Sequence, residues 1–462
     1  MSDQSSPRAW KLVKWIIASP AAVLLIIMIG VSVRYVSNKA RLDRLQSRRV
    51  IIEFEDVVPD TIRRFVGQSR CEPFDQIKSI TFVEVCDEDL IKWRGSYDVK
   101  SICVVSNLAN DAVTDRGLQL LGDLRLLENL TICGGRFTAQ GMLALASCPK
   151  LARLKIENPT MADDCYKVIE TLPHLTELII DKEEEFTAEE VRAITRSSHM
   201  RTVRLNMSYG ERFRRTHLDA PNGMNWALGT ESLTSELLEP LTKLQRIDSL
   251  ALHCESMDSE ALASLSKLPT LQALQITAGK ITADNLKCLG GCSSLRSLII
   301  DCNNEASDHG LDQLIPLKSL TQLILCCSEL TPNDVQALSQ LTQLTSLRIE
   351  LEMSGELDFT RLQTLTNLEE LDLKEVAGFD GNFSVLQSMP RLHWLRVRTE
   401  ARLPHPLQTL MDHSKLPPAL MSAAPNTLRE IAIHLEMFPE TKFMIVSIGQ
   451  RRLLPKDRWS PA

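Results

Sequence analysis

The chain has 462 residues, a length that allows about three globular domains of ordinary size or one long repeat domain. Apolar residues make up 44% of the sequence and charged residues 24%, proportions that exclude wholesale disorder and a collagen-like fibre. Aromatic residues are only 5%, so we expect a core built mainly from aliphatic side chains.

The net charge of -7 conceals a basic N-terminal end. The first 49 residues carry nine Lys and Arg against two Asp, a balance of +7, which leaves -14 for the remaining 413 residues. This acidic remainder argues against a general nucleic-acid-binding surface, because neutralising phosphates requires clustered Lys and Arg. We therefore expect no nucleic-acid partner.

The segment from Trp15 to Val33 is 19 residues long and contains no charge. At ~1.5 Å per residue, a helix of this length spans about 28 Å, close to the roughly 30 Å hydrocarbon core of a bilayer. The sequence therefore predicts a transmembrane helix over 15–33, between a short tail at 1–14 and a basic juxtamembrane segment at 34–49. A cleaved signal peptide is the alternative, although the apolar run is longer than such peptides usually contain.

Lys and Arg flank this segment on both sides, and more of them follow it than precede it. The positive-inside rule therefore favours a cytoplasmic location for the rest of the chain, but short basic N-terminal tails also stay inside. The 12 cysteines do not form the framework of a small disulfide-rich secreted domain, which agrees with that location. We expect a single-pass membrane protein and leave the side of its main domain open.

A repeated pattern, LxxLxL with aliphatic substitutions, dominates the chain after residue 76. Its strong copies are separated by 24 or 25 residues, apart from one step of 47 residues. These copies begin at Leu127, Leu151, Leu175, Met200, Ile247, Leu271, Leu295, Leu320, Leu344, Leu368 and Leu392. Self-similarity at a fixed period is the signature of a repeat array, in which neighbouring units stack to bury a shared core.

Each unit has the pattern of a strand, a turn and a short helix. Apolar residues at unit positions 1, 4 and 6 suit an inward-facing strand, and residues such as Leu262, Leu265 and Leu268 have the spacing of a helix face. A threonine recurs between the two, at Thr138, Thr187, Thr282 and Thr331. Its hydroxyl can accept from the free N–H groups of a first helical turn, and Glu190 and Asp334 follow two of these threonines at capping-box spacing.

These units resemble those of leucine-rich-repeat proteins, written LxxLxLxxxxxTDxGLxxLxxLxx. The best matches are VTDRGLQLLGDLRLLENLTI from Val113 and ASDHGLDQLIPLKSLTQLIL from Ala306. The resemblance implies an α/β solenoid with a parallel concave sheet and short convex helices. The order of parts, with an anchor helix before the repeats, also resembles bacterial single-pass membrane-anchored leucine-rich-repeat proteins. The usual Asn at unit position 9 is largely absent, which argues against the buried Asn ladder of that family.

The domain organisation follows from the repeat. We expect an N-terminal cap at 50–76, the solenoid at 77–433, and a C-terminal cap and tail at 434–462. The 47-residue step from Met200 to Ile247 lacks the strand pattern, so we interpret about 206–246 as an insertion or a degenerate unit that forms a loop. Loops on repeat arrays often carry binding residues.

Unit positions 3, 5 and 7 should face away from the core, on the concave side of the sheet. From these positions we predict a partner-binding patch of aliphatic side chains flanked by Trp and Arg, a composition found at protein interfaces. It comprises Ile299, Ile324, Arg348, Trp394, Arg396 and Arg398. The alternative is that Arg348, Asp372 and Arg396 merely neutralise one another on adjacent strands.

No signature of a hydrolase, a nucleotide-binding loop or a metal site is present, and several cysteines recur at fixed unit positions as small apolar residues would. We therefore expect no catalytic residues, no metal and no cofactor. The sequence favours a membrane-tethered scaffold or receptor that binds a protein partner through its repeat surface. The alternative is an enzyme or regulatory subunit whose functional part is the 206–246 insertion.

Overall fold

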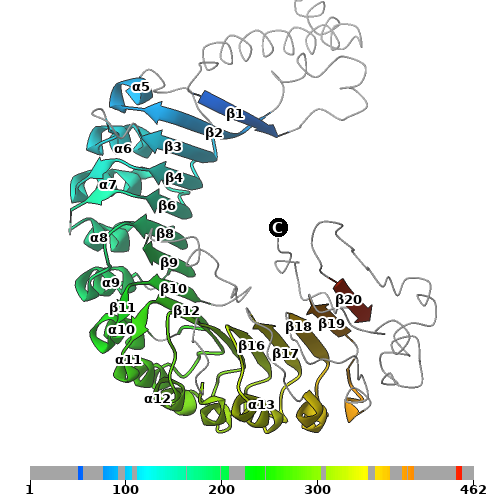
Figure 1. Ribbon diagram of the computed structural model, residues 1–462. Coiled ribbons are helices and arrows are strands. Elements are labelled where there is room, and N and C mark those ends of the chain that lie inside the picture. The colour runs from blue at the N-terminus through cyan, green and yellow to red at the C-terminus, as the bar shows by residue number, and fades with distance from the viewer. Residues whose placement is uncertain are drawn as a thin grey trace, which may run out of the picture. The chain divides into compact units, whose positions relative to one another are not determined.

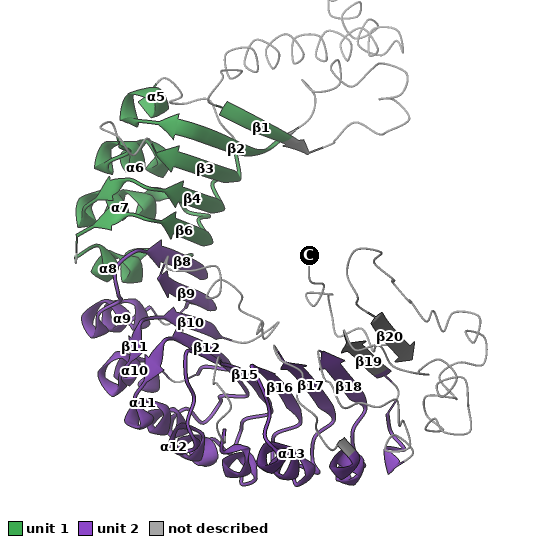
Figure 2. Cartoon of the chain, in the orientation of Figure 1, with its two compact units in different colours: residues 1–175 green, residues 176–462 purple. Residues whose placement is uncertain are grey.

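The computed structural model divides the chain into two compact units, Met1–Leu175 and Thr176–Ala462 (Figure 2). The structure describes residues 50–55, 76–91, 99–106, 112–162, 164–197, 199–207, 224–244, 246–302, 309–351, 359–374, 388–392, 394–399 and 444–449. The predicted transmembrane helix at 15–33 and its flanking segments lie outside these residues. Within the described ranges, no helix has both the length and the apolar character needed to cross a bilayer.

In the first unit, a sheet lies against a series of short helices (Figure 1). The strands follow the order β1 (Val50–Glu55), β2 (Gln76–Val85), β3 (Ser101–Ser106), β4 (Asn129–Cys133) and β6 (Arg153–Glu157). The two-residue strands β5 (Arg136–Phe137) and β7 (Thr160–Met161) pair separately. The helices are α5 (Asp87–Ile91), α6 (Asp115–Gly122), α7 (Ala139–Ala144) and α8 (Cys165–Val168), with 3₁₀ turns η2 (Leu145–Ser147) and η3 (Ile169–Thr171). Strands β2 to β6 run parallel, as the repeat predicts.

The second unit continues the same alternation of strand and helix. Its sheet follows the order β8 (Glu177–Lys182), β9 (Thr202–Met207), β10 (Asn225–Gly229), β12 (Ser249–Cys254), β14 (Ala273–Ala278), β15 (Ser297–Cys302), β16 (Gln322–Cys327), β17 (Ser346–Leu351), β18 (Glu370–Lys374), β19 (Trp394–Thr399) and β20 (Met444–Gly449). A second, two-stranded sheet joins β11 (Ser232–Leu233) and β13 (Ser256–Met257). The helices are α9 (Ala188–Thr195), α10 (Ser235–Thr242), α11 (Ser259–Ser264), α12 (Ala283–Cys288) and α13 (Pro332–Ser339). The 3₁₀ turns are η5 (Leu265–Lys267), η6 (Leu289–Gly291), η7 (Leu311–Leu314) and η8 (Phe359–Thr364).

The core of each unit consists of the predicted aliphatic positions. In the copy that begins at Leu127, positions 1, 4 and 6 are exposed by only 0%, 1% and 0%. The helical face is equally buried, with Leu262 and Leu265 at 0% exposure. Fully burying an aliphatic side chain of this size contributes roughly 1.5–3 kcal/mol, so stacking of neighbouring units supplies most of the stability of the fold.

An antiparallel strand stands at one edge of each sheet. In the first unit β1 pairs with β2, and in the second unit β20 pairs with β19, both in antiparallel register. The two strands come from the segments in which the sequence predicts an N-terminal cap and a C-terminal cap. Each pairs with the last parallel strand at its edge, which would otherwise present free N–H and C=O groups.

Of the two interpretations of about 206–246, an insertion or a degenerate unit, the structure supports a degenerate unit, but this unit forms a strand and a helix and not a loop. Residues 225–229 form strand β10, which pairs in parallel with β9 and β12, and helix α10 follows it. The segment 224–244 is therefore a repeat unit, and only 208–223 lie outside the described residues. The pattern missed this unit because two of its three aliphatic positions differ: Gly223 stands at position 1, and Trp226, in register with Leu250, stands at position 4.

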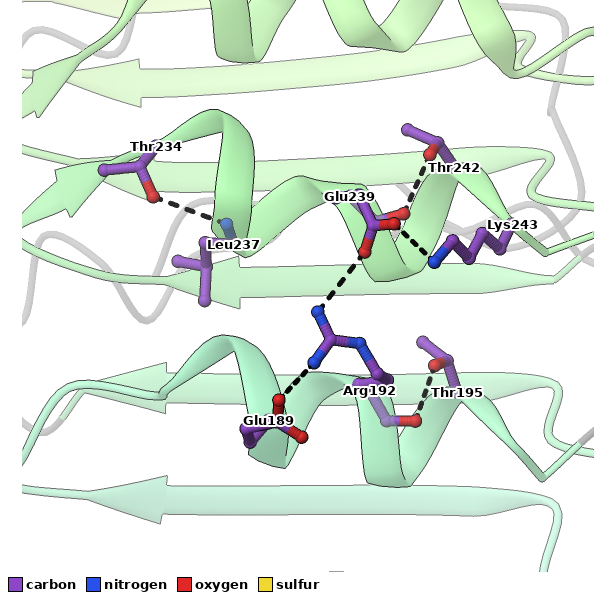
Figure 3. A network of polar contacts seen from close by, with 8 residues as sticks. All are labelled: Glu189, Arg192, Thr195, Thr234, Leu237, Glu239, Thr242 and Lys243. Carbon is purple, nitrogen blue, oxygen red and sulfur yellow. Dashed lines mark hydrogen bonds and ion pairs between the residues drawn. The ribbon is translucent and has the colours of Figure 1, made fainter.

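Helices α9 and α10 are also joined by polar contacts on their exposed side (Figure 3). Glu239 accepts from Arg192 Nη2 at 3.4 Å and pairs with Lys243 on its own helix. Arg192 in turn pairs with Glu189. Solvent-exposed pairs of this kind contribute about 0–1 kcal/mol each, so burial rather than charge holds the helices together.

Candidate functional site

Parallel register places the predicted partner-binding residues in rows that cross the main sheet of the second unit. One row runs through Gln275, Ile299, Ile324, Arg348, Asp372 and Arg396. Trp394 belongs to the row of Ser346 and Glu370, and Arg398 to the row of Glu350 and Lys374. The structure thus brings the predicted residues onto adjacent strands, in three neighbouring rows.

The aliphatic centre of the predicted patch is not exposed. Ile299 is 1% exposed, Ile324 6% and Trp394 6%. In β15 and β16 the central concave-facing residue is as buried as the core-facing ones, while the concave-facing residues on either side of it are partly exposed. In β17 buried and partly exposed side chains alternate throughout. The prediction of an open aliphatic patch is therefore wrong. Alternation in a sequence indicates the direction in which a side chain points, but not whether something else packs on that face.

Arg348 lies in an acidic environment. Its Nε is 3.7 Å from Asp372 Oδ2, and its Nη2 pairs with Glu350. Glu350 Oε2 is also 3.6 Å from Lys374 Nζ. The contact between Arg348 and Asp372 agrees with the alternative interpretation, in which charges on neighbouring strands neutralise one another. The part of that interpretation that concerns Arg396 stays a prediction. Arg348 is only 20% exposed, so most of its side chain is committed to this network.

The concave side of the first unit is different, because its side chains remain partly exposed. Strands β3, β4 and β6 each turn alternate residues to this side, and all of these residues are intermediate or exposed. Register aligns them in three rows: Ser101, Asn129 and Arg153; Cys103, Thr131 and Lys155; Val105, Cys133 and Glu157. The rule that positions 3, 5 and 7 face outward identifies all of them, although none belongs to the predicted partner-binding patch.

A cysteine, a histidine and an aspartate meet in the core of the second unit. His309 Nδ1 is 3.0 Å from Asp334 Oδ2, and Cys302 lines the same small cavity as His309. The three residues are 2%, 4% and 1% exposed, respectively. The cavity is lined mainly by aliphatic core side chains, so we assign the cluster to the stability of the repeat. In the described part of the chain, no group of three or more His, Cys, Asp or Glu side chains could hold a metal ion.

The geometry of the unit decides the fold. Units of 24 or 25 residues place parallel strands in register, bury aliphatic side chains at positions 1, 4 and 6, and mostly begin their helices at a capping threonine. The chain has a leucine-rich-repeat fold. The finer resemblance, to membrane-anchored leucine-rich-repeat proteins, stays a prediction, because it depends on residues that the structure does not describe.

Comparison with solved structures found several repeat proteins. An internalin from Listeria monocytogenes is 20% identical, with a TM-score of 0.40 over 77% of this chain and 92% of its own. A chain from the TLR13–ssRNA13 complex is 16% identical, with a TM-score of 0.40 over 70% of this chain and 51% of its own. A chain from the mouse RP105/MD-1 complex is 15% identical, with a TM-score of 0.41 over 69% and 54%. The present chain spans about half the length of the last two. No protein-family model and no curated protein sequence matches it.

Proposed function

We propose that this leucine-rich-repeat protein is a membrane-tethered, non-catalytic scaffold or receptor that binds a protein partner. The observation that supports binding best is the partly exposed concave side of the first unit. There, three adjacent strands present aligned rows of side chains on a regular sheet. A sheet of stacked repeats offers an extended surface of fixed geometry, which suits a folded protein better than a small molecule.

The chemistry of this surface supports a protein partner. Its rows change from small and neutral residues on β3 to charged ones on β6, where Arg153, Lys155 and Glu157 carry both signs. A nucleic acid would need clustered positive charge instead. Within the predicted patch of the second unit, Arg396 and Arg398 stay proposed contacts, whereas Ile299, Ile324 and Trp394 are withdrawn because they are buried.

Site-specific cross-linking tests the binding surface. A photoreactive residue at Asn129, on the concave side, should give adducts with a partner in cells. The same residue at Leu143, which is 51% exposed on helix α7, provides the control. Adducts that form equally from both positions, or from neither, would contradict a concave binding site.

The proposed tether is the apolar segment from Trp15 to Val33, anchored by the basic residues that follow it. The full chain should remain with membranes after salt and alkaline washing, and a chain that begins at Val50 should be released. A mature N-terminus near Asn38 would instead favour a cleaved signal peptide. Protease digestion of intact cells would establish the side of the repeat domain, which we propose to be cytoplasmic.

The alternative, an enzyme or regulatory subunit with its functional part at 206–246, has no observation in its favour. Residues 224–244 form an ordinary repeat unit with a capped helix. Residues 208–223 of this segment lie outside the described residues.

A further inference from the structure

The central row on the concave side of the second unit is buried from strand β10 onward. The concave-facing residues of β9 are still partly exposed, but Ala227 on β10 and Ala251 on β12 are only 3% and 2% exposed. Gln275 and Ile299 continue the same row and are 1% exposed each. Two adjacent alanines cannot shield each other from water, because neither methyl group rises above the other. A further layer of the molecule therefore packs on this row.

A matched pair of serines shows that the strands alone do not cause this burial. Ser101 in the first unit and Ser249 in the second both stand at unit position 3, on the concave side. Each lies between short side chains on the two neighbouring strands. Ser101 is nevertheless partly exposed, whereas Ser249 is 1% exposed. The extra layer is therefore specific to the second unit.

One repeat of the second unit differs from its neighbours. Thr202 of β9 is in register with Asn225 of β10, so a step of 23 residues, about one repeat, separates the two strands. Among the described residues, no helix stands between these strands in the sequence, and residues 208–223 lie outside them. In the repeats before and after, the corresponding stretch forms the convex helices α9 and α10.

The convex layer has no room for another helix at this point. Helices α9 and α10 contact each other directly, with Arg192 Nη2 at 3.4 Å from Glu239 Oε2 (Figure 3). The turns before these helices are also joined, because Glu185 Oε1 accepts from the Glu231 N–H at 2.7 Å. Packed helices lie about 8–10 Å apart, and two strand spacings of about 4.8 Å cover the same distance. The helix layer thus closes over β9 without a contribution from the β9 repeat.

We propose that residues 208–223 dock onto the concave side of the second unit, over the row from Ala227 to Ile324. The sequence of this segment suits such a contact, because Tyr209, Phe213 and Leu218 supply apolar surface to the alanine and isoleucine side chains of the row. A path outside the convex helices would leave the same row exposed to water.

The length of the segment agrees with the extent of the buried row. At ~3.4 Å per residue, the 16 residues span at most about 54 Å. Because the chain must also return about 17 Å along the strand direction, it extends at most about 25 Å sideways, or about five strand spacings. This limit falls between β16 and β17. Ile324 on β16 is 6% exposed, whereas Arg348, the next residue of the row, is partly exposed.

This contact reserves the row for the chain itself. It leaves the binding of a protein partner to strands whose concave side chains stay partly exposed, such as β3, β4 and β6 in the first unit.

Cysteine labelling of the full chain tests the contact. Ala251→Cys should react slowly with a maleimide, because a buried thiol reacts only through local unfolding. Replacing residues 208–223 by a Gly/Ser segment of equal length should speed this labelling by about tenfold or more. Thr131→Cys, on the concave side of the first unit, should react rapidly with either segment. Native Cys302, which is 2% exposed in the core, should stay unlabelled and reports that the repeats remain folded.

Two results of this labelling would overturn the proposal. Rapid reaction of Ala251→Cys beside the native segment would show that the row is open. Protection that persists beside the Gly/Ser segment would show that a different part of the chain, or a second copy, occupies the row.

Photo-cross-linking identifies the occupant without altering the segment. A diazirine amino acid at Gln275 should give adducts with residues 208–223 of the same chain, located by mass spectrometry. A mixture of isotopically labelled and unlabelled chains separates these adducts from contacts between two copies. Adducts confined to other parts of the chain, adducts between copies, or no adducts would overturn the proposal, whether or not the Gly/Ser variant folds.

Discussion

In the first unit, a carboxylate of one repeat binds the threonine that caps the helix of the next repeat. Asp115 accepts from the Thr138 backbone N–H at 2.8 Å and also from its hydroxyl. Asp87 does the same for Thr114, with its backbone N–H at 2.9 Å. The approach requires a glycine, because a Cβ at Gly141 would lie 2.2 Å from Asp115 Oδ1. These contacts account physically for the TDxGL part of the repeat: the threonine caps, the aspartate reaches the following unit, and the glycine provides space.

Replacing this glycine should therefore destabilise the first unit. We expect Gly141→Ala to lower the free energy of unfolding by about 1–3 kcal/mol, the usual cost of overpacking. The control is Gly290→Ala, because a Cβ at Gly290 would have no atom within 4 Å. Urea denaturation of the two variants measures the difference. Equal midpoints would contradict the steric argument.

The buried pair of His309 and Asp334 should make stability depend on pH. Burial alone would lower the pKa of His309, but hydrogen bonds with Asp334 and Cys302 outweigh it and raise the pKa to about 9. Because the pKa of His309 is higher in the folded state than its unfolded value of about 6.5, protonation of His309 stabilises the fold. This stabilisation is complete below pH 6.5 and is lost as the pH rises through about 9. The pKa of Asp334 is lowered, since its hydrogen bonds with His309 and Thr331 outweigh burial, so its own contribution is lost only in acid.

Asp334→Asn removes the negative charge but should keep the helix cap, because an asparagine, Asn285, is the capping-box partner at the same position in α12. Between pH 6 and pH 9, the free energy of unfolding of the wild type should fall by up to about 3 kcal/mol more than that of the variant. Denaturant titrations across that range measure the loss. Parallel curves for the two proteins would show that His309 does not gain a proton in the folded state.

At the scale of single elements, capping was largely predictable from the sequence. The capping boxes of Thr187 with Glu190 and of Thr331 with Asp334 form as expected. The box of Thr282 with Asn285 was not predicted, because Asn is not a usual third residue of the motif. The cap of α10 at Thr234 was missed for another reason, namely that its unit has Trp226 in place of an aliphatic residue.

The capping box of α9 contains a buried ion pair that the pattern did not indicate. Lys182 Nζ is 2.8 Å and 2.9 Å from the two carboxylate oxygens of Glu190, and both side chains are nearly buried. Lys182→Met leaves a buried carboxylate without its cation and should cost about 3–5 kcal/mol. Lys243→Met, which removes an exposed partner of Glu239, should cost no more than about 1 kcal/mol. Thermal unfolding of both variants compares these costs, and similar losses would contradict the distinction between buried and exposed pairs.

At the scale of the whole molecule, the sequence predicted the architecture better than the site. The 24-residue period and the aliphatic positions 1, 4 and 6 determine which strands are neighbours and which side chains enter the core. The burial of Ile299 and Ile324 could not be predicted, because their direction follows from strand alternation whereas their cover depends on tertiary packing. Cys103 and Cys133 occupy outward positions that the pattern does identify, but their diagonal placement on two adjacent strands follows from the strand register and is not visible in the linear sequence.

Register across the repeats predicts that a whole unit can be removed. Ser249, Ala273 and Ser297 are in register on β12, β14 and β15, so deleting residues 271–294 should allow β12 to pair with β15 without altering the core. The shortened chain should keep its circular dichroism spectrum and unfold in urea with a smaller m-value, because less surface is exposed. Deleting residues 271–282 is the control, since it removes β14 together with the Thr282 cap of α12 but leaves the helix. We expect this half-unit deletion to unfold the second unit. Equal damage from the two deletions would mean that the repeats do not contribute as separable units.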